Sequence, residues 1–105
     1  MIRVSVLYPR TEGARFDWAY YLDSHLPLVR RRLGAALKSI AVEQGLAGGA
    51  PGSPPAYVAL AHLTFDSVEV FQTAFAAHAP EILADIPRYT PIEPTIQLSD
   101  VRLAS

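Results

Sequence analysis

Tyrosines and one histidine near the N-terminus are the side chains of this sequence best suited to acid–base chemistry. His25 follows Tyr21 by four residues, so both side chains share one face if the segment is helical. A half-buried imidazole beside a phenol can serve as a general base or acid near neutral pH. The competing interpretation is structural, because His25 can also cap carbonyls left free by Pro27 or pack where helix meets sheet. We predict His25 as the catalytic residue if the protein is an enzyme.

Four further aromatic residues are candidates for contact with a ligand. Tyr8 ends the expected first strand, and Tyr20 lies in the first turns of the expected first helix. A tyrosine hydroxyl can orient a polar ligand atom while its ring supplies apolar wall, although both residues can equally be core aromatics. Phe71 and Phe75 belong to the core of the second helix and would face any pocket beneath it.

The remaining histidines give no clear metal or cofactor site. His62 lies in an apolar strand and faces either a pocket or an interface, whereas His78 ends the second helix, where the helix dipole favours its charged form. A haem ligand at His78 is a weak alternative without other haem features. No histidines or carboxylates share ligand spacing on one element, and cysteine is absent, so we predict neither a metal nor a cofactor.

These candidates depend on a first helix that carries most of them. Alternating apolar residues predict a strand over Ile2 to Tyr8 before it. Asp17 is a suitable N-cap, with Phe16 and Tyr21 as a hydrophobic staple. Pro27 must either kink the helix or restart it, which distorts the backbone around His25. The predicted buried stripe consists of Trp18, Leu22, either His25 or Leu26, Val29 and Leu33, with Gly34 as the stop.

The rest of the chain completes a recognisable order of elements. A Gly-, Pro- and Ser-rich loop joins two strands as a long hairpin, and Asp66 is expected to open the second helix. The resulting order β-α-β-β-α-β is the signature of a ferredoxin-like α+β fold, with a four-stranded antiparallel sheet and both helices on one face. Residues 1–105 therefore form one domain. The expected elements are strands 37–46, 57–65 and 95–103, a helix from 66 to about 79, and a short turn over 80–86.

Composition excludes several classes of partner. The formal charge is −1, and the single basic cluster, Arg30 to Arg32, is too narrow for a nucleic-acid surface. No apolar run approaches the length of a membrane span, so we expect a cytoplasmic protein without a membrane partner. The third strand is apolar on nearly every position, which indicates that both sheet faces are covered. A second copy of the chain is the simplest cover, and it predicts a homodimer.

Motifs at both ends of the chain resemble the EthD family, which is named after a protein linked to ethyl tert-butyl ether degradation. The resemblance implies a dimeric α/β barrel, and it places Tyr89 with the predicted ligand-contacting residues. It does not choose a reaction, because related barrels include cofactor-free monooxygenases, isomerases, polyketide-tailoring enzymes and haem proteins. The motifs are Tyr8-Pro9, Phe16-Asp17, Tyr20-Tyr21, His25-Leu26-Pro27-Leu28, Tyr89-Thr90-Pro91, Glu93-Pro94 and Ile96-Gln97-Leu98-Ser99.

Three functions remain open on the sequence. The first is a cofactor-independent oxidoreductase or isomerase that acts on a hydrophobic or aromatic molecule, with His25 moving a proton and Tyr8 or Tyr20 holding an oxygen. The second is a non-catalytic module that binds such a molecule or assists an oxygenase system. The third is a purely structural dimerising domain, which would have no pocket behind the first helix.

Overall fold

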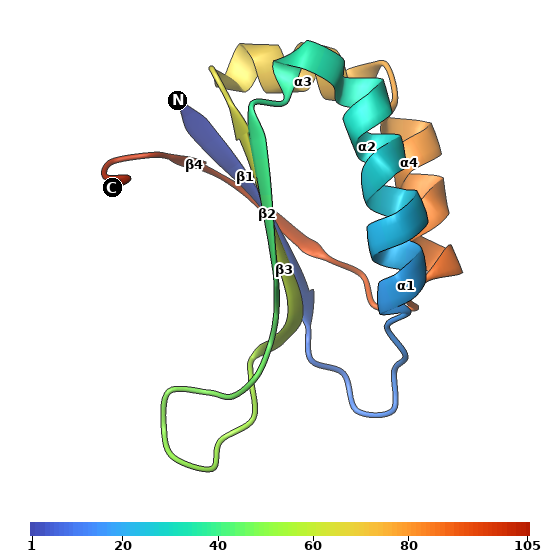
Figure 1. Cartoon of the computed structure of the whole chain (residues 1–105), viewed down its shortest axis with the longest axis vertical. Coiled ribbons are helices and arrows are strands. Elements are labelled where there is room, and N and C mark those ends of the chain that lie inside the picture. The colour runs from blue at the N-terminus through green and yellow to red at the C-terminus, as the bar shows by residue number, and fades with distance from the viewer.

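A computed structural model describes residues 1–105 and confirms the predicted ferredoxin-like architecture. Strands β1 (Ile2–Pro9), β2 (Ser39–Gln44), β3 (Tyr57–Phe65) and β4 (Thr95–Asp100) form one antiparallel sheet in the order β2-β3-β1-β4. All helices lie on one side of this sheet, and the β2–β3 loop extends beyond its end (Figure 1). None of the helices combines the length and apolar character that crossing a membrane requires.

The inner face of the sheet carries most of the core. Alternate residues of β1 and β3 point toward the helices, because side chains along a strand alternate between faces. Val4 pairs with Leu63 and Val6 with Ala61, and together with neighbours from the helices these residues form the main apolar cluster. The bounds of β3 match the prediction, whereas β2 and β4 are shorter than the predicted ranges 37–46 and 95–103.

The first helical region is interrupted, as Pro27 requires. It consists of α1 (Trp18–Tyr20), a π-helical turn η1 (Tyr21–His25) and α2 (Leu26–Leu33), followed by a short 3₁₀ turn η2 (Gly34–Ala36). The Leu26 amide bonds to the carbonyl of Tyr21, five residues back, which defines the wide turn. Pro27 lies in the first turn of α2, where its missing amide is tolerated.

The predicted stripe of the first helix is partly wrong because of this turn. Leu22 is 49% exposed and Trp18 is only half-buried. The buried row is instead Tyr21, His25, Val29 and Leu33, at a constant spacing of four residues. In a regular α-helix, residues four apart differ by about 40° in direction around the helix axis. The wider π turn holds more residues per turn, so it reduces this difference.

The second helical region corrects two predictions. The N-cap of α3 (Val68–Ala76) is Ser67, not Asp66, because the Ser67 hydroxyl accepts a hydrogen bond from the Val70 amide at 3.1 Å. Asp66 instead forms an ion pair with Lys38 at 3.8 Å. The predicted short turn over 80–86 is a further helix, α4 (Ala79–Asp85), with Pro80 in its first turn, and a 3₁₀ turn η3 (Ile86–Arg88) follows it.

The start of α1 agrees with the sequence. The carboxylate of Asp17 accepts a hydrogen bond from the Tyr20 amide at 3.1 Å, as expected of an N-cap. The rings of Phe16 and Tyr21 lie 5.0 Å apart, edge to face, so the predicted staple is formed.

Candidate functional site

An apolar cavity lies between the helices and the inner face of the sheet. Its volume is about 90 Å³, and 15 of its 16 lining residues are hydrophobic, the exception being His25. Three of the predicted ligand-contacting residues, Tyr8, Phe71 and Phe75, line the cavity. A more open groove of about 460 Å³ adjoins it and shares Leu83, Ile86 and Ile96 with its lining.

His25 enters this cavity from the π turn with a carboxylate behind it. Its side chain is almost fully buried, and Nδ1 lies 2.9 Å from Oδ2 of Asp85, at the end of α4. An ionised carboxylate can only accept, so Nδ1 carries the proton and donates it to Asp85. Nε2 then has a free lone pair and makes no hydrogen bond within the chain. No fully buried side-chain nitrogen or oxygen lacks a partner, so Nε2 keeps some accessible surface, and His25 is one of the residues that line the cavity.

The electrostatics of the pair favour a neutral imidazole beside an ionised carboxylate. Burial lowers the pKa of His25 below its ordinary value and outweighs the hydrogen bond and charge of Asp85, which act to raise it. Burial alone would raise the pKa of Asp85, but hydrogen bonds from Tyr20 and His25 lower it overall. Near neutral pH the pair is therefore poised to accept a proton at Nε2.

The Asp85 carboxylate also contacts Tyr20 and Arg88. The Tyr20 hydroxyl donates to Oδ1 at 2.7 Å, and this bond raises the pKa of Tyr20. Nε of Arg88 lies 3.6 Å from the same oxygen. Tyr20 therefore positions the carboxylate and is not among the residues that line the cavity, so its role as a ligand contact stays a prediction.

Two buried tyrosines, of which Tyr8 lines the cavity, share a hydrogen bond. The hydroxyls of Tyr8 and Tyr89 are 2.5 Å apart, and both side chains are almost fully buried. Burial raises the pKa of Tyr8 to about 12, and it raises the pKa of Tyr89 as well. The Tyr89 ring packs 4.7 Å from that of His25 but is not part of the cavity lining. Tyr89 thus contacts Tyr8 through its hydroxyl and His25 through its ring.

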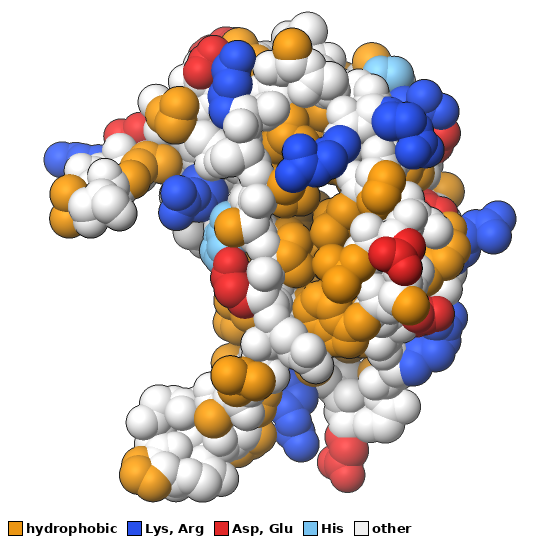
Figure 2. All heavy atoms as spheres, in the orientation of Figure 1, with side chains coloured by type: hydrophobic (Ala, Val, Ile, Leu, Met, Phe, Trp, Pro, Cys, Tyr) orange, Lys and Arg blue, Asp and Glu red, His pale blue; other side chains and the backbone are white.

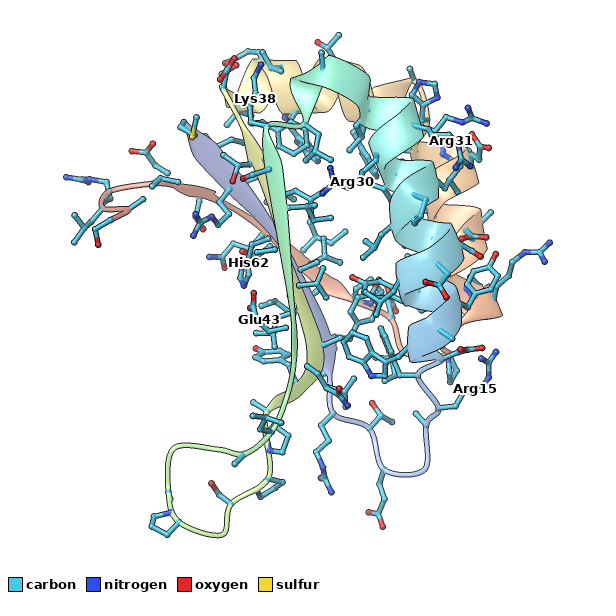
Figure 3. All side chains as sticks on the ribbon, in the orientation of Figure 1. Arg15, Arg30, Arg31, Lys38, Glu43 and His62 are labelled. Atoms are coloured by element: carbon cyan, nitrogen blue, oxygen red, sulfur yellow. The ribbon has the colours of Figure 1, made fainter.

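The other two histidines lie outside this site. His62 faces away from the helices, between Ser5 and Glu43 of the neighbouring strands (Figure 3). Its Nδ1 is 2.9 Å from the Ser5 hydroxyl and its Nε2 is 3.2 Å from Glu43. His78 occupies the position before α4 and makes no capping hydrogen bond through its side chain.

Sequence reasoning missed Asp85, which is 60 residues from His25 along the chain. A local signal was present, since Asp85 is the one charged residue in the run Ile82 to Pro87. A carboxylate in such a run needs a partner where the run is buried. What the run did not reveal was which element supplies that partner.

Comparison with known proteins agrees with the architecture and the motifs. The model of the EthD domain matches residues 12–91. An EthD-like protein of Ralstonia eutropha JMP134 is 52% identical, with a TM-score of 0.94 over 99% of this chain and 94% of that one. None of the curated proteins matches the chain.

More distant structures share the fold alone. An ethyl tert-butyl ether D (EthD) family protein of Bacillus halodurans C-125 is 18% identical, with a TM-score of 0.66, and the match covers 96% of this chain and 98% of that one. An antibiotic biosynthesis monooxygenase is 14% identical, with a TM-score of 0.51 and the same coverage of each chain.

Proposed function

This chain belongs to the EthD family, and we propose that it binds a small hydrophobic or aromatic molecule in the cavity and moves a proton on it with His25. One observation carries the proposal: the buried imidazole lines an apolar cavity with no hydrogen bond at Nε2, while Asp85 holds Nδ1 at 2.9 Å. An imidazole fixed in this way, with a lowered pKa, is suited to general base catalysis.

The proposed chemistry divides between three side chains. Nε2 of His25 removes a proton from a carbon next to a carbonyl, and Asp85 stabilises the imidazolium that forms. When the Tyr89 hydroxyl donates to that of Tyr8, Tyr8 keeps its own proton, which it can donate to a ligand oxygen in the cavity that it lines. Return of the proton to another carbon gives an isomerase, and reaction of the carbanion with oxygen gives a cofactor-independent oxidoreductase.

Deuterium exchange tests proton transfer without knowledge of the natural substrate. We expect the protein to accelerate exchange of the protons beside the carbonyl of small aryl ketones in D₂O, beginning with phenylacetone, as followed by ¹H NMR. His25→Gln should lower this rate by about 10²- to 10⁴-fold, the usual contribution of a general base. His78→Gln, outside the cavity, should leave it unchanged. Equal rates for wild type and His25→Gln, at comparable melting temperatures, would contradict the assignment.

A non-catalytic binding or accessory role is the second candidate. It is favoured by the composition of the cavity, since no second ionisable acid–base group joins His25 in its lining apart from tyrosine hydroxyls. It predicts that native mass spectrometry of protein taken from cells detects an unmodified small molecule bound to the chain. It also predicts that the protein does not accelerate deuterium exchange of ketone protons. The purely structural alternative fits poorly, because it predicts no cavity behind the first helix.

We further propose that the protein forms a homodimer through the outer face of the sheet. No helix covers this face, and half-buried Leu7 and Leu60 pair at its centre. Such a surface gains stability when a second copy covers it. Native mass spectrometry at micromolar concentration should give twice the chain mass of 11.4 kDa. A monomer at all concentrations tested would refute the dimer while leaving the cavity chemistry intact.

A further inference from the structure

Three consecutive arginines on α2 differ in what their side chains meet. Successive helical residues are rotated by about 100°, so Arg30 and Arg32 point to opposite flanks of the helix. Arg32 faces α4 and makes two hydrogen bonds to Glu81, at 2.7 and 3.1 Å. Arg30 takes part in none of the ion pairs or side-chain hydrogen bonds of the chain. Its guanidinium therefore has all its donors available.

The position of Arg30 is next to the cavity. Leu26 and Leu33 line the cavity, and they lie four residues before and three residues after Arg30 on the same helix. Residues at these spacings are neighbours on a helix surface. The Arg30 side chain extends from α2 into the space toward β2, whereas Arg31 points away from the sheet (Figure 3). Arg30 thus lies beside the cavity-lining residues of α2, on the flank of the helix that faces β2.

The surface beneath the guanidinium is apolar. Figure 2 shows hydrophobic side chains at the base of the hollow between β2 and α2, with a cationic side chain across its upper end. On β2, Ile40 and Val42 point to this side, because they pair with the inward-facing Leu63 and Ala61. No carboxylate of the sheet faces the hollow here, since Glu43 lies on the outer face.

From this arrangement we propose that Arg30 binds the anionic group of the ligand, so that the ligand class is a small carboxylate with an apolar body. The inference rests on the proposed use of the cavity as the ligand site. A guanidinium forms two parallel hydrogen bonds with a carboxylate, and it can do so without first breaking an internal ion pair. The apolar body would then occupy the cavity and approach His25.

Phenylacetate and phenylacetamide provide a matched pair of probes, because they share shape and differ in charge. Binding is measured by ¹H–¹⁵N NMR titration at low ionic strength. Arg30→Met keeps an apolar stem over the hollow and removes the guanidinium, Arg30→Lys keeps the charge, and Arg31→Met is the control. We expect Arg30→Met to lose at least about fivefold in phenylacetate affinity and less than twofold in phenylacetamide affinity. Arg31→Met should match the wild type, and Arg30→Lys should recover part of the loss.

The outcomes distinguish failure of the proposed role of Arg30 from failure of the cavity as a ligand site. If phenylacetamide binds in the cavity and Arg30→Met still binds phenylacetate like the wild type, the role of Arg30 is refuted and the cavity remains a ligand site. An equal loss for both probes also refutes it, because the side chain then acts only through its apolar stem. If neither probe shifts a resonance of a cavity residue, the ligand site and the inference both fail.

Discussion

The hydroxyl pair of Tyr8 and Tyr89 gives the sharpest test of the site's construction. Both side chains are buried and their hydroxyl oxygens are 2.5 Å apart, without another side-chain partner. Tyr8→Phe leaves the Tyr89 hydroxyl buried and unsatisfied, which costs about 1–3 kcal/mol, and Tyr89→Phe does the same to Tyr8. The double variant removes both hydroxyls, so no unsatisfied group remains and the cost should fall to about 0–1 kcal/mol.

The two single costs therefore sum to about 2–6 kcal/mol, and the double variant should be at least about 1 kcal/mol more stable than that sum predicts. Urea unfolding monitored by circular dichroism measures all four free energies of unfolding. Tyr57→Phe is the control, because the Tyr57 side chain makes no hydrogen bond and its loss should change stability by less than about 0.5 kcal/mol. Additive costs in the double variant would refute the claim that each hydroxyl is satisfied by the other.

Two further predictions concern pH and capping. The pKa of His25 is lowered in the folded protein, so the unfolded chain binds this proton first and the free energy of unfolding should fall as pH drops through about 6.5. The pKa of Asp85 is also lowered, so its contribution to the free energy of unfolding is present above about pH 3.9 and lost below it. Urea unfolding measured across pH should show both losses of stability, and His25→Gln should remove the loss near pH 6.5. Ser67→Ala should cost about 1 kcal/mol in thermal unfolding, whereas Asp66→Ala should cost clearly less, because Ser67 is the N-cap of α3.

The parts of the fold that depend on local patterns could be predicted from the sequence. Alternation over Ile2 to Tyr8 and the apolar run Tyr57 to Phe65 each identified a strand, and the structure confirms both. Asp17 was identified as an N-cap because its carboxylate acts on an amide only three residues away. These features are settled by the chemistry of neighbouring residues, so they need no knowledge of tertiary contacts.

The parts that depend on register or on distant contacts could not be predicted. The face of His62 became known only with the pairing of Ser5 and His62, because a strand that is apolar on nearly every position gives no alternation to follow. Pro27 indicated a distortion near His25, but it did not indicate a π turn, and with that turn Leu22 is exposed. Asp85 at the end of α4 reaches His25 of η1 through a side-chain hydrogen bond across 60 residues of chain.

Both members of the acid–base pair are followed closely by a proline. His25 and Asp85 each stand two residues before a proline, at Pro27 and Pro87. Each is also the last residue of a helical segment, His25 of the π turn and Asp85 of α4. A proline after such a position removes an amide from the next turn and changes the path of the helix. The two interruptions bring an imidazole and a carboxylate together at 2.9 Å, with the buried row from Tyr21 to Leu33 behind them. The imidazole and the carboxylate therefore meet where two helical segments end, each just before a segment that has proline in its first turn.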